Sequence, residues 1–79
     1  MTQRDRMLRH MIDFGSITRL EAFREYGIVE APARITELRQ RGYDITTSYE
    51  YGKNRYGEPV KWAKWTLRRN NEQIQNIDG

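Results

Sequence analysis

The fold of this chain is decided by residues 18–42, which read TRLEAFREYGIVEAPARITELRQRG. Thr18 and Glu21 have the spacing of a capping box, in which each side chain accepts a hydrogen bond from the backbone amide of the other residue. We expect a helix to begin there and to end at Gly27, because glycine adopts the left-handed backbone of a helix end easily. Its predicted inward side chains are Leu20, Phe23 and Tyr26, with Ile28 over the helix end.

A second short helix follows after a turn of about four residues. Pro32 favours the first turn of a helix, where its missing amide would be unpaired anyway. Ala31, Ile35 and Leu38 recur on one face, and Gly42 closes the helix. Two short amphipathic helices joined by a turn that contains glycine form a helix-turn-helix unit.

Another predicted helix precedes this unit and ends at Gly15. Thr2 and Asp5 provide an N-cap and an acidic first turn. Its predicted core side chains are Met7, Leu8, Met11, Ile12 and Phe14. His10 lies off this stripe and has no Cys, His or paired carboxylate at ligand spacing, so we expect it to be exposed, with no metal or catalytic role.

The pattern changes to a period of two residues from Tyr43 onwards. One predicted strand places on one face Ile45, Thr47, Tyr49 and Tyr51. A turn over residues 52–58 leads to a second strand over residues 60–67, with Ala63, Trp65 and Leu67 on one face. A lone hairpin is marginal in water, so we expect Ile45, Leu67 and a buried Trp65 to pack on the helices. A very short extended piece at Ser16 and Ile17 can pair with a later strand.

Three helices followed by a two-stranded β-hairpin predict an α+β fold of the winged helix-turn-helix class. The sequence resembles the small helix-turn-helix domains common in phages and mobile elements over residues 3–67. The matching residues are Gly15-Ser16-Ile17-Thr18, Glu21-Ala22, Gly27-Ile28, Ala33-Arg34-Ile35, Leu38-Arg39, Gly42-Tyr43, Ile45 and Asn54-Arg55-Tyr56-Gly57. The resemblance implies a DNA-binding module of viral or mobile-element origin and carries over no catalytic residue.

The length of 79 residues allows one hydrophobic core. We expect one domain over residues 1–69 and a flexible polar tail over residues 70–79. The chain has no cysteine, one histidine, no apolar run long enough for a membrane span and no signal-peptide core. We therefore expect a cytoplasmic, nucleoid-associated protein of a bacterial or phage-infected cell, without cofactor, metal site, small-molecule ligand or enzymatic activity.

The net charge of +3 is distributed unevenly along the chain. Residues 1–33 hold five basic and five acidic side chains, residues 34–69 hold nine basic and four acidic, and residues 70–79 hold two acidic and none basic. A local excess of cations is typical of a surface that contacts phosphates, because each neutralised phosphate releases counterions. Chance segregation is the alternative interpretation.

The second helix of a helix-turn-helix unit lies in the major groove of DNA. The residues predicted to read bases are Ala33, Thr36, Glu37, Arg39 and Gln40. Gln40 can pair with adenine and Arg39 with guanine, while Thr36 or Ala33 can offer a methyl group to thymine. Arg34 and Arg41 lie nearer the helix edge and suit phosphates. The alternative is a solvated helix face.

The hairpin tip forms a basic finger that suits a minor groove or a phosphate strand. Its predicted contact residues are Lys53, Asn54, Arg55 and Tyr56, and the positive stripe continues along the returning strand through Lys61 and Lys64. The alternative is an ordinary charged turn. Tyr49, Tyr51 and Trp62 could stack on single strands, form a dimer contact or, as we favour, pack across the strands.

The leading hypothesis is a sequence-specific double-stranded DNA-binding protein. It would serve as a transcriptional regulator or as a recombination or excision accessory factor of a phage or mobile element, acting as a monomer or a DNA-assembled homodimer. The alternative is a protein-binding winged-helix module that targets a host, replication or defence complex, with the hairpin aromatics as its contact, since fold alone does not settle function.

Overall fold

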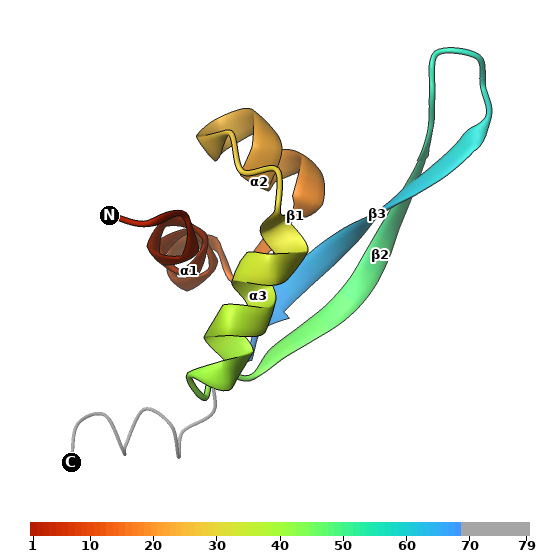
Figure 1. Cartoon of the computed structure of the whole chain (residues 1–79). Helices are drawn as coiled ribbons and strands as arrows, with labels where there is room; N and C mark the ends of the chain where they lie inside the picture. Colours follow the sequence, from red (N-terminus) through yellow and green to blue (C-terminus); the bar gives the residue numbers. More distant parts are fainter. Residues whose placement is uncertain (69–79) are drawn as a thin grey trace.

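The computed structural model describes residues 1–68 of the chain. Along this part the elements are α1 (Gln3–Phe14), β1 (Ser16–Thr18), α2 (Arg19–Tyr26), α3 (Ala31–Gln40), β2 (Ile45–Lys53) and β3 (Pro59–Leu67) (Figure 1). The predicted order of three helices and a hairpin is confirmed. The predicted tail over residues 70–79 lies outside the described residues. No described helix has the length and apolar character of a membrane span.

The sheet has three antiparallel strands in the order β1-β3-β2. β2 pairs with the whole of β3, from Ile45 opposite Leu67 to Lys53 opposite Pro59. β1 adds a third strand to the two of the predicted hairpin, with Ile17 opposite Trp65. The short extended piece expected before α2 is therefore present, and it lies on the edge of β3 that faces away from β2.

The helix ends follow the local signals in the sequence. In the capping box of α2, the amide of Glu21 donates to Thr18 Oγ1 at 3.0 Å and the amide of Thr18 donates to Glu21 Oε1 at 2.9 Å. Thr2 and Asp5 form the equivalent box at α1. Gly27 ends α2 in the left-handed region, with φ of 67°. Thr18 is thus both the last residue of β1 and the N-cap of α2.

The core lies between the three helices and the inner half of the sheet. Ile35 and Leu38 of α3, Ile28 after α2, and Ile45 and Trp65 of the sheet are all buried, as expected. Full burial of such side chains contributes about 1.5–3 kcal/mol each to stability. The core is completed by Met7, Met11, Ile17, Ala22 and Ala31.

The predicted core face of α2 is wrong at two positions. Leu20 is 43% exposed and Phe23 is 58% exposed, whereas Ala22 is fully buried. Tyr26 packs partly against the core. On an α-helix Tyr26 is rotated only about 40° from Ala22, while Leu20 is rotated about 160° away. The inward face therefore follows Ala22 and Tyr26, and the larger apolar side chains of α2 lie outside.

The predicted exposure of His10 is also wrong. His10 is 8% exposed and its Nδ1 lies 2.7 Å from the hydroxyl oxygen of Tyr26. The core face of α1 follows Met7 and Met11, and His10 is rotated about 60° from Met7, at the edge of this face. Ile12 is rotated about 100° from Met11, on the side away from Met7, and is exposed, contrary to prediction. Phe14, the last residue of α1, is exposed as well, with its ring 4.7 Å from that of His10.

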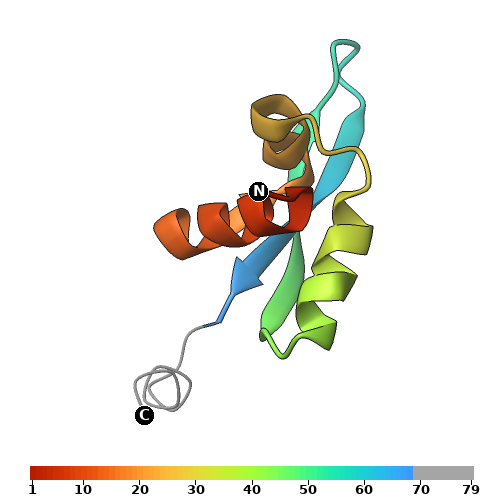
Figure 2. The ribbon, with the colours of Figure 1, turned by 60° about the vertical axis from the view of Figure 1, so that its left-hand side comes forward.

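The outer half of the hairpin extends beyond the helices. We call residues 49–63, which lie past the last pairing of β1 with β3, the wing. Figures 1 and 2 show this part of β2 and β3 projecting away from the helical layer, while their inner half is covered by it. The wing and α3 are therefore presented on a common scaffold, which the inner sheet holds together.

Candidate nucleic-acid interface

The outer face of α3 carries three of the residues predicted to read bases. Thr36 and Gln40 are exposed and Ala33 is half-buried. Thr36 Oγ1 donates to the carbonyl oxygen of Pro32 at 3.1 Å, so the hydroxyl is used within the helix. Within residues 1–68 the amide of Gln40 has no hydrogen bond, and Arg41 beside it is exposed without an ion pair. This face offers an amide, a cation and methyl groups to a ligand.

Glu37 and Arg34, also predicted contacts, are paired with each other. Arg34 Nη2 lies 3.2 Å from Glu37 Oε2, and Arg4 Nη1 of α1 lies 3.6 Å from Glu37 Oε1. The carboxylate of Glu37 is thus held between two guanidinium groups, which offset its negative charge on this face of the molecule. The Nε atoms of Arg4 and Arg34 are buried without a hydrogen-bond partner within the described chain.

Arg39 connects α3 to the inner half of β2. Its Nε and Nη2 donate to the carbonyl oxygen of Ile45 at 3.1 and 2.8 Å, and Nη2 also donates to Thr47 Oγ1 at 2.8 Å. Hydrogen bonds from a charged donor are worth about 1.5–3 kcal/mol. The structure therefore places this side chain where it sets the position of α3 against β2.

Asn54 closes the turn at the wing tip. Its Oδ1 accepts from the amides of Tyr56 at 2.9 Å and Glu58 at 3.0 Å, and its Nδ2 donates to Glu58 Oε1 at 3.0 Å. The neighbouring side chains of Lys53, Arg55 and Tyr56 are exposed, and neither cation has an ion pair in residues 1–68. The tip thus presents two free cations on a turn that Asn54 fixes.

The positive stripe predicted along β3 is divided between the two faces of the sheet. Lys61 lies on the face of Tyr49 and Tyr51, with its Nζ 4.9 Å from the centre of the Tyr49 ring. Lys64 lies on the opposite face, with its Nζ 3.5 Å from Glu50 Oε2. The two lysines therefore do not form one continuous stripe, because residues three apart in a strand point to opposite sides.

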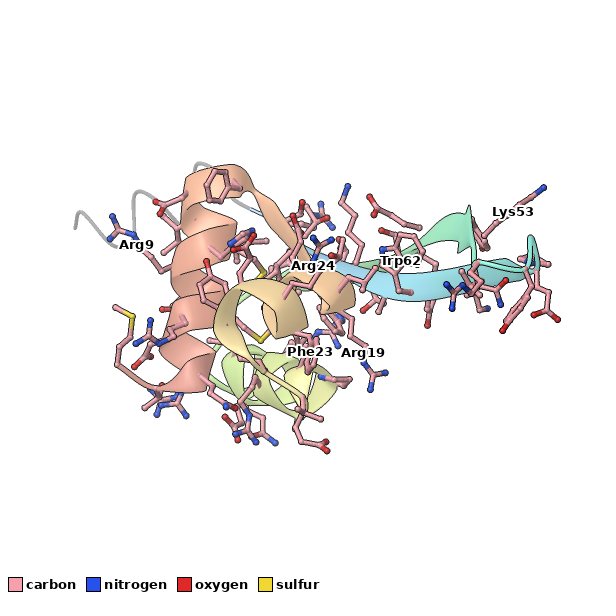
Figure 3. All side chains as sticks on the ribbon, turned by 90° about the horizontal axis from the view of Figure 1, so that it is seen from above. Arg9, Arg19, Phe23, Arg24, Lys53 and Trp62 are labelled. Atoms are coloured by element: carbon pink, nitrogen blue, oxygen red, sulfur yellow. The ribbon has the colours of Figure 1, made fainter. Side chains whose placement is uncertain are left out.

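Trp62 packs across the strands, as favoured from the sequence. Its Nε1 donates to Glu50 Oε1 at 3.1 Å. A Cβ on Gly52 would lie 3.0 Å from the far edge of the indole, so the ring lies directly on this glycine. Figure 3, viewed from above, shows Trp62 on the wing and Lys53 extending outward near its tip.

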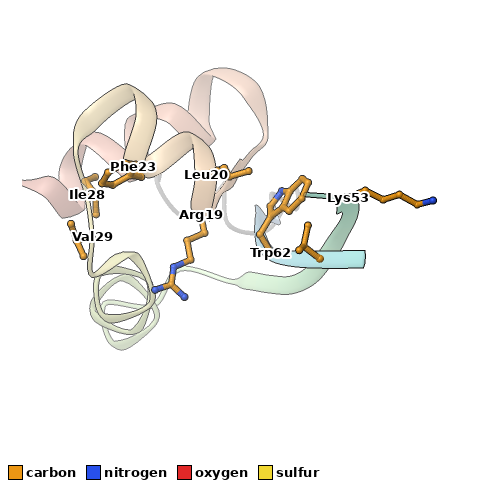
Figure 4. A pocket seen from close by; sticks show the side chains of 8 residues that line it. Arg19, Leu20, Phe23, Ile28, Val29, Lys53 and Trp62 are labelled. Atoms are coloured by element: carbon orange, nitrogen blue, oxygen red, sulfur yellow. The ribbon is translucent and has the colours of Figure 1, made fainter. Parts of the chain in front are cut away.

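Sequence reasoning missed a groove between α2 and the wing (Figure 4). It has a volume of about 620 Å³ and is lined by Leu20 and Phe23 of α2, by Val29 of the following turn, and by Val60 and Trp62 of the wing. Arg19 and Lys53 add two cations. The groove was missed because α2 is rotated relative to the prediction. Leu20 and Phe23, which were assigned to the core, line the groove instead.

The comparisons with known proteins agree with this geometry. A family described as the winged helix-turn-helix domain matches residues 2–69. The chain belongs to this family. Comparison with curated proteins and with solved structures gave no match. Membership of the winged helix-turn-helix family indicates DNA binding, and the family's two named features correspond to the α2–α3 unit and the hairpin described above.

Proposed function

We propose that this protein binds double-stranded DNA sequence-specifically, with α3 in the major groove and the wing tip on the adjacent backbone or minor groove. The observation that carries the proposal is the outer face of α3. The side chains of Gln40 and Arg41 are exposed there without partners among residues 1–68, while those of Arg39 and Glu37 are held by internal contacts. A rigidly held helix with free polar groups suits base recognition.

Base recognition falls to Gln40, Thr36 and Ala33. The free amide of Gln40 suits the paired donor and acceptor of adenine. The hydroxyl of Thr36 is bonded to Pro32, so its methyl group is what it offers, and a methyl group suits thymine. Arg39 and Glu37, whose side chains have internal partners, act as positioning residues that hold α3.

Phosphate contacts fall to the unpaired cations. Arg41 follows α3, and Lys53 and Arg55 extend from the wing tip. Lys61, over the ring of Tyr49, can join them from the same wing face as Tyr51. Three or four phosphate contacts predict that the logarithm of affinity falls with the logarithm of salt concentration with a slope of about −2.7 to −3.6.

In the cell we infer a transcriptional regulator or a recombination or excision accessory factor of a phage or mobile element. A module of this size that uses one recognition helix reads a short site, and a monomer or a DNA-assembled homodimer fits a domain without a long apolar helix in its described part. We propose no catalytic activity and a location at the nucleoid.

The experiment that tests this function is selection of binding sites from a randomised duplex, followed by salt titration of the selected site. We expect one enriched sequence and a salt slope near that of the predicted phosphate contacts. Chemical shift changes in the labelled protein should gather on residues 33–41 and 53–56. Equal binding of all duplexes would contradict sequence-specific recognition, and absence of binding at low salt would contradict the function itself.

A further inference from the structure

The groove between α2 and the wing carries more exposed apolar surface than folding requires. Phe23 and Val29 are 58% and 59% exposed, and Leu20 and Val60 are 43% and 37% exposed. All four line the same groove. Contiguous apolar patches are uncommon on small monomeric domains and mark interaction sites. These side chains are therefore better explained by a binding partner than by the stability of the domain.

The wing side of the groove is held in place before any partner arrives. The indole of Trp62 lies on Gly52 and donates to Glu50, and Glu50 is in turn paired with Lys64. An aromatic wall fixed from behind loses little conformational entropy on binding. Gly52 is the residue that allows this arrangement, since any side chain there would displace the indole.

The charged side chains that line the groove are all positive. Arg19 and Lys53 line it together with the apolar residues, and no acidic side chain does. Within residues 1–68 neither cation has an ion pair, whereas Glu50 behind the groove is already engaged by Trp62 and Lys64. Complementary charge guides association, so the partner is expected to be acidic as well as apolar.

The groove also contains an open strand edge. β1 covers β3 only at Lys64–Thr66, and the chain then leaves the sheet as α2. Residues 60–63 of β3 therefore pair with β2 on one side and with no described strand on the other. An unpaired strand edge is a template for an additional strand. This edge lies at the groove, because Val60 and Trp62 line it together with Arg19, the first residue after β1.

We propose that the groove binds an extended acidic segment of a partner protein as an additional β-strand. The segment would continue the sheet past β1, along residues 60–63 of β3. Its alternate apolar side chains would pack against Leu20, Phe23 and Trp62, and its carboxylates would face Arg19 and Lys53. The backbone hydrogen bonds supply affinity, and the apolar pockets supply specificity.

A DNA duplex fits this groove less well than such a segment. Duplex DNA presents phosphates on its outside, and its apolar groups are the thymine methyl groups inside the major groove, which do not match a wall of Leu20, Phe23 and Val29. The groove shares only Lys53 with the surface that we propose for DNA. The strand-binding proposal therefore does not depend on DNA binding, and the two can be tested separately.

The test uses the isotopically labelled full chain and a synthetic peptide of alternating glutamate and valine with blocked ends. We expect chemical shift changes at residues 19–23 and 60–63, with slower amide exchange at residues 60–63. Phe23→Ser should lower the affinity for the peptide about tenfold. Tyr51→Ser, which removes an exposed aromatic from the other face of the wing, should leave peptide affinity unchanged. Thermal melting checks that both variants fold.

Two modified peptides distinguish strand addition from nonspecific attraction. A peptide with serine in place of valine keeps the charge and should bind at least tenfold more weakly. A peptide N-methylated at alternate backbone amides keeps the side chains and should lose the slowed exchange. Equal binding of either peptide would overturn the proposal. So would shift changes at residues 60–63 that require duplex DNA, which would assign the groove to nucleic acid.

Discussion

The guanidinium group of Arg39 donates to the carbonyl oxygen of Ile45 at 2.8 Å through Nη2 and at 3.1 Å through Nε. This contact joins the last turn of α3 to the first residue of β2. With a third hydrogen bond from Nη2 to Thr47 Oγ1, the side chain ties α3 to β2 at two residues. Arg39, which the sequence predicts to contact a base, therefore helps to set the orientation of the proposed recognition helix.

Replacement of Arg39 separates positioning from base reading. Arg39→Ala should lower the free energy of unfolding by about 1–3 kcal/mol, because the carbonyl oxygen of Ile45 loses both donors. DNA affinity should fall with little change in the preferred sequence. Thermal melting and repeated site selection measure both effects. A changed preference at a single base pair would show instead that Arg39 reads DNA directly. Arg39→Lys should not restore wild-type stability, because lysine lacks the fork geometry.

Gln40 and Arg41 are adjacent and should behave differently. Gln40→Ala should reduce the difference in binding free energy between the preferred base pair and its alternatives by about 1–3 kcal/mol at one position of the site. Its affinity for unrelated duplexes should change little. Arg41→Ala should weaken all duplexes alike and reduce the salt slope by about 0.9. Fluorescence anisotropy on the selected site and on a scrambled duplex measures both. Arg6→Ala, an exposed arginine on α1, is the control and should change neither.

Gly52 provides a test of the Trp62 packing. Gly52→Ala places a Cβ 3.0 Å from the indole, which must shift and weaken its hydrogen bond to Glu50. We expect a loss of about 1–3 kcal/mol in stability, the range typical of overpacking, and a change in tryptophan fluorescence. The loss should be much smaller when Gly52→Ala is made in a Trp62→Leu background. An equal loss in both backgrounds would mean that the cost comes from the backbone.

The carboxylate of Asp5, at the start of α1, should make the stability of the domain depend on pH. Thr2 lowers the pKa of Asp5 below its ordinary 3.8, first through its side chain and then through its backbone. A lowered native pKa means that the charged carboxylate stabilises the fold above pH 3.8 and that this contribution is lost as pH falls through the native value. Asp5→Asn should therefore destabilise the domain at neutral pH, and the difference should vanish in acid. Denaturant melts across this range measure it.

Local features of the sequence predicted the elements and their ends well. Thr18 with Glu21 marked the start of α2, and Gly27 and Pro32 marked the turn before α3. Each of these signals works through hydrogen bonds or backbone geometry within a few residues, so no knowledge of the tertiary fold is needed. The burial of Trp65 followed from the need of a hairpin to cover one face.

Which side of a short helix points into the core could not be predicted in the same way. Leu20 and Phe23 are the larger apolar side chains of α2, yet the packing of this helix against the other elements buries Ala22 instead. His10 is buried because Tyr26, sixteen residues later, supplies a partner for its ring. The internal bonds of Arg39 likewise depend on Ile45 being close in space, which residue type alone does not indicate.

Thr18 has a consequence for how the chain tolerates insertions. As the last residue of β1 it faces Lys64, and as the N-cap of α2 its hydroxyl must stay at Glu21. If β1 slid by one residue along β3, Ile17 would turn out of the core, and the hydrogen bond between Thr18 and Glu21 at the start of α2 would break at the same time. The three-residue strand thus has a single alignment. An extra residue after Gly15 must bulge out of the chain, because neither neighbour can move to absorb it.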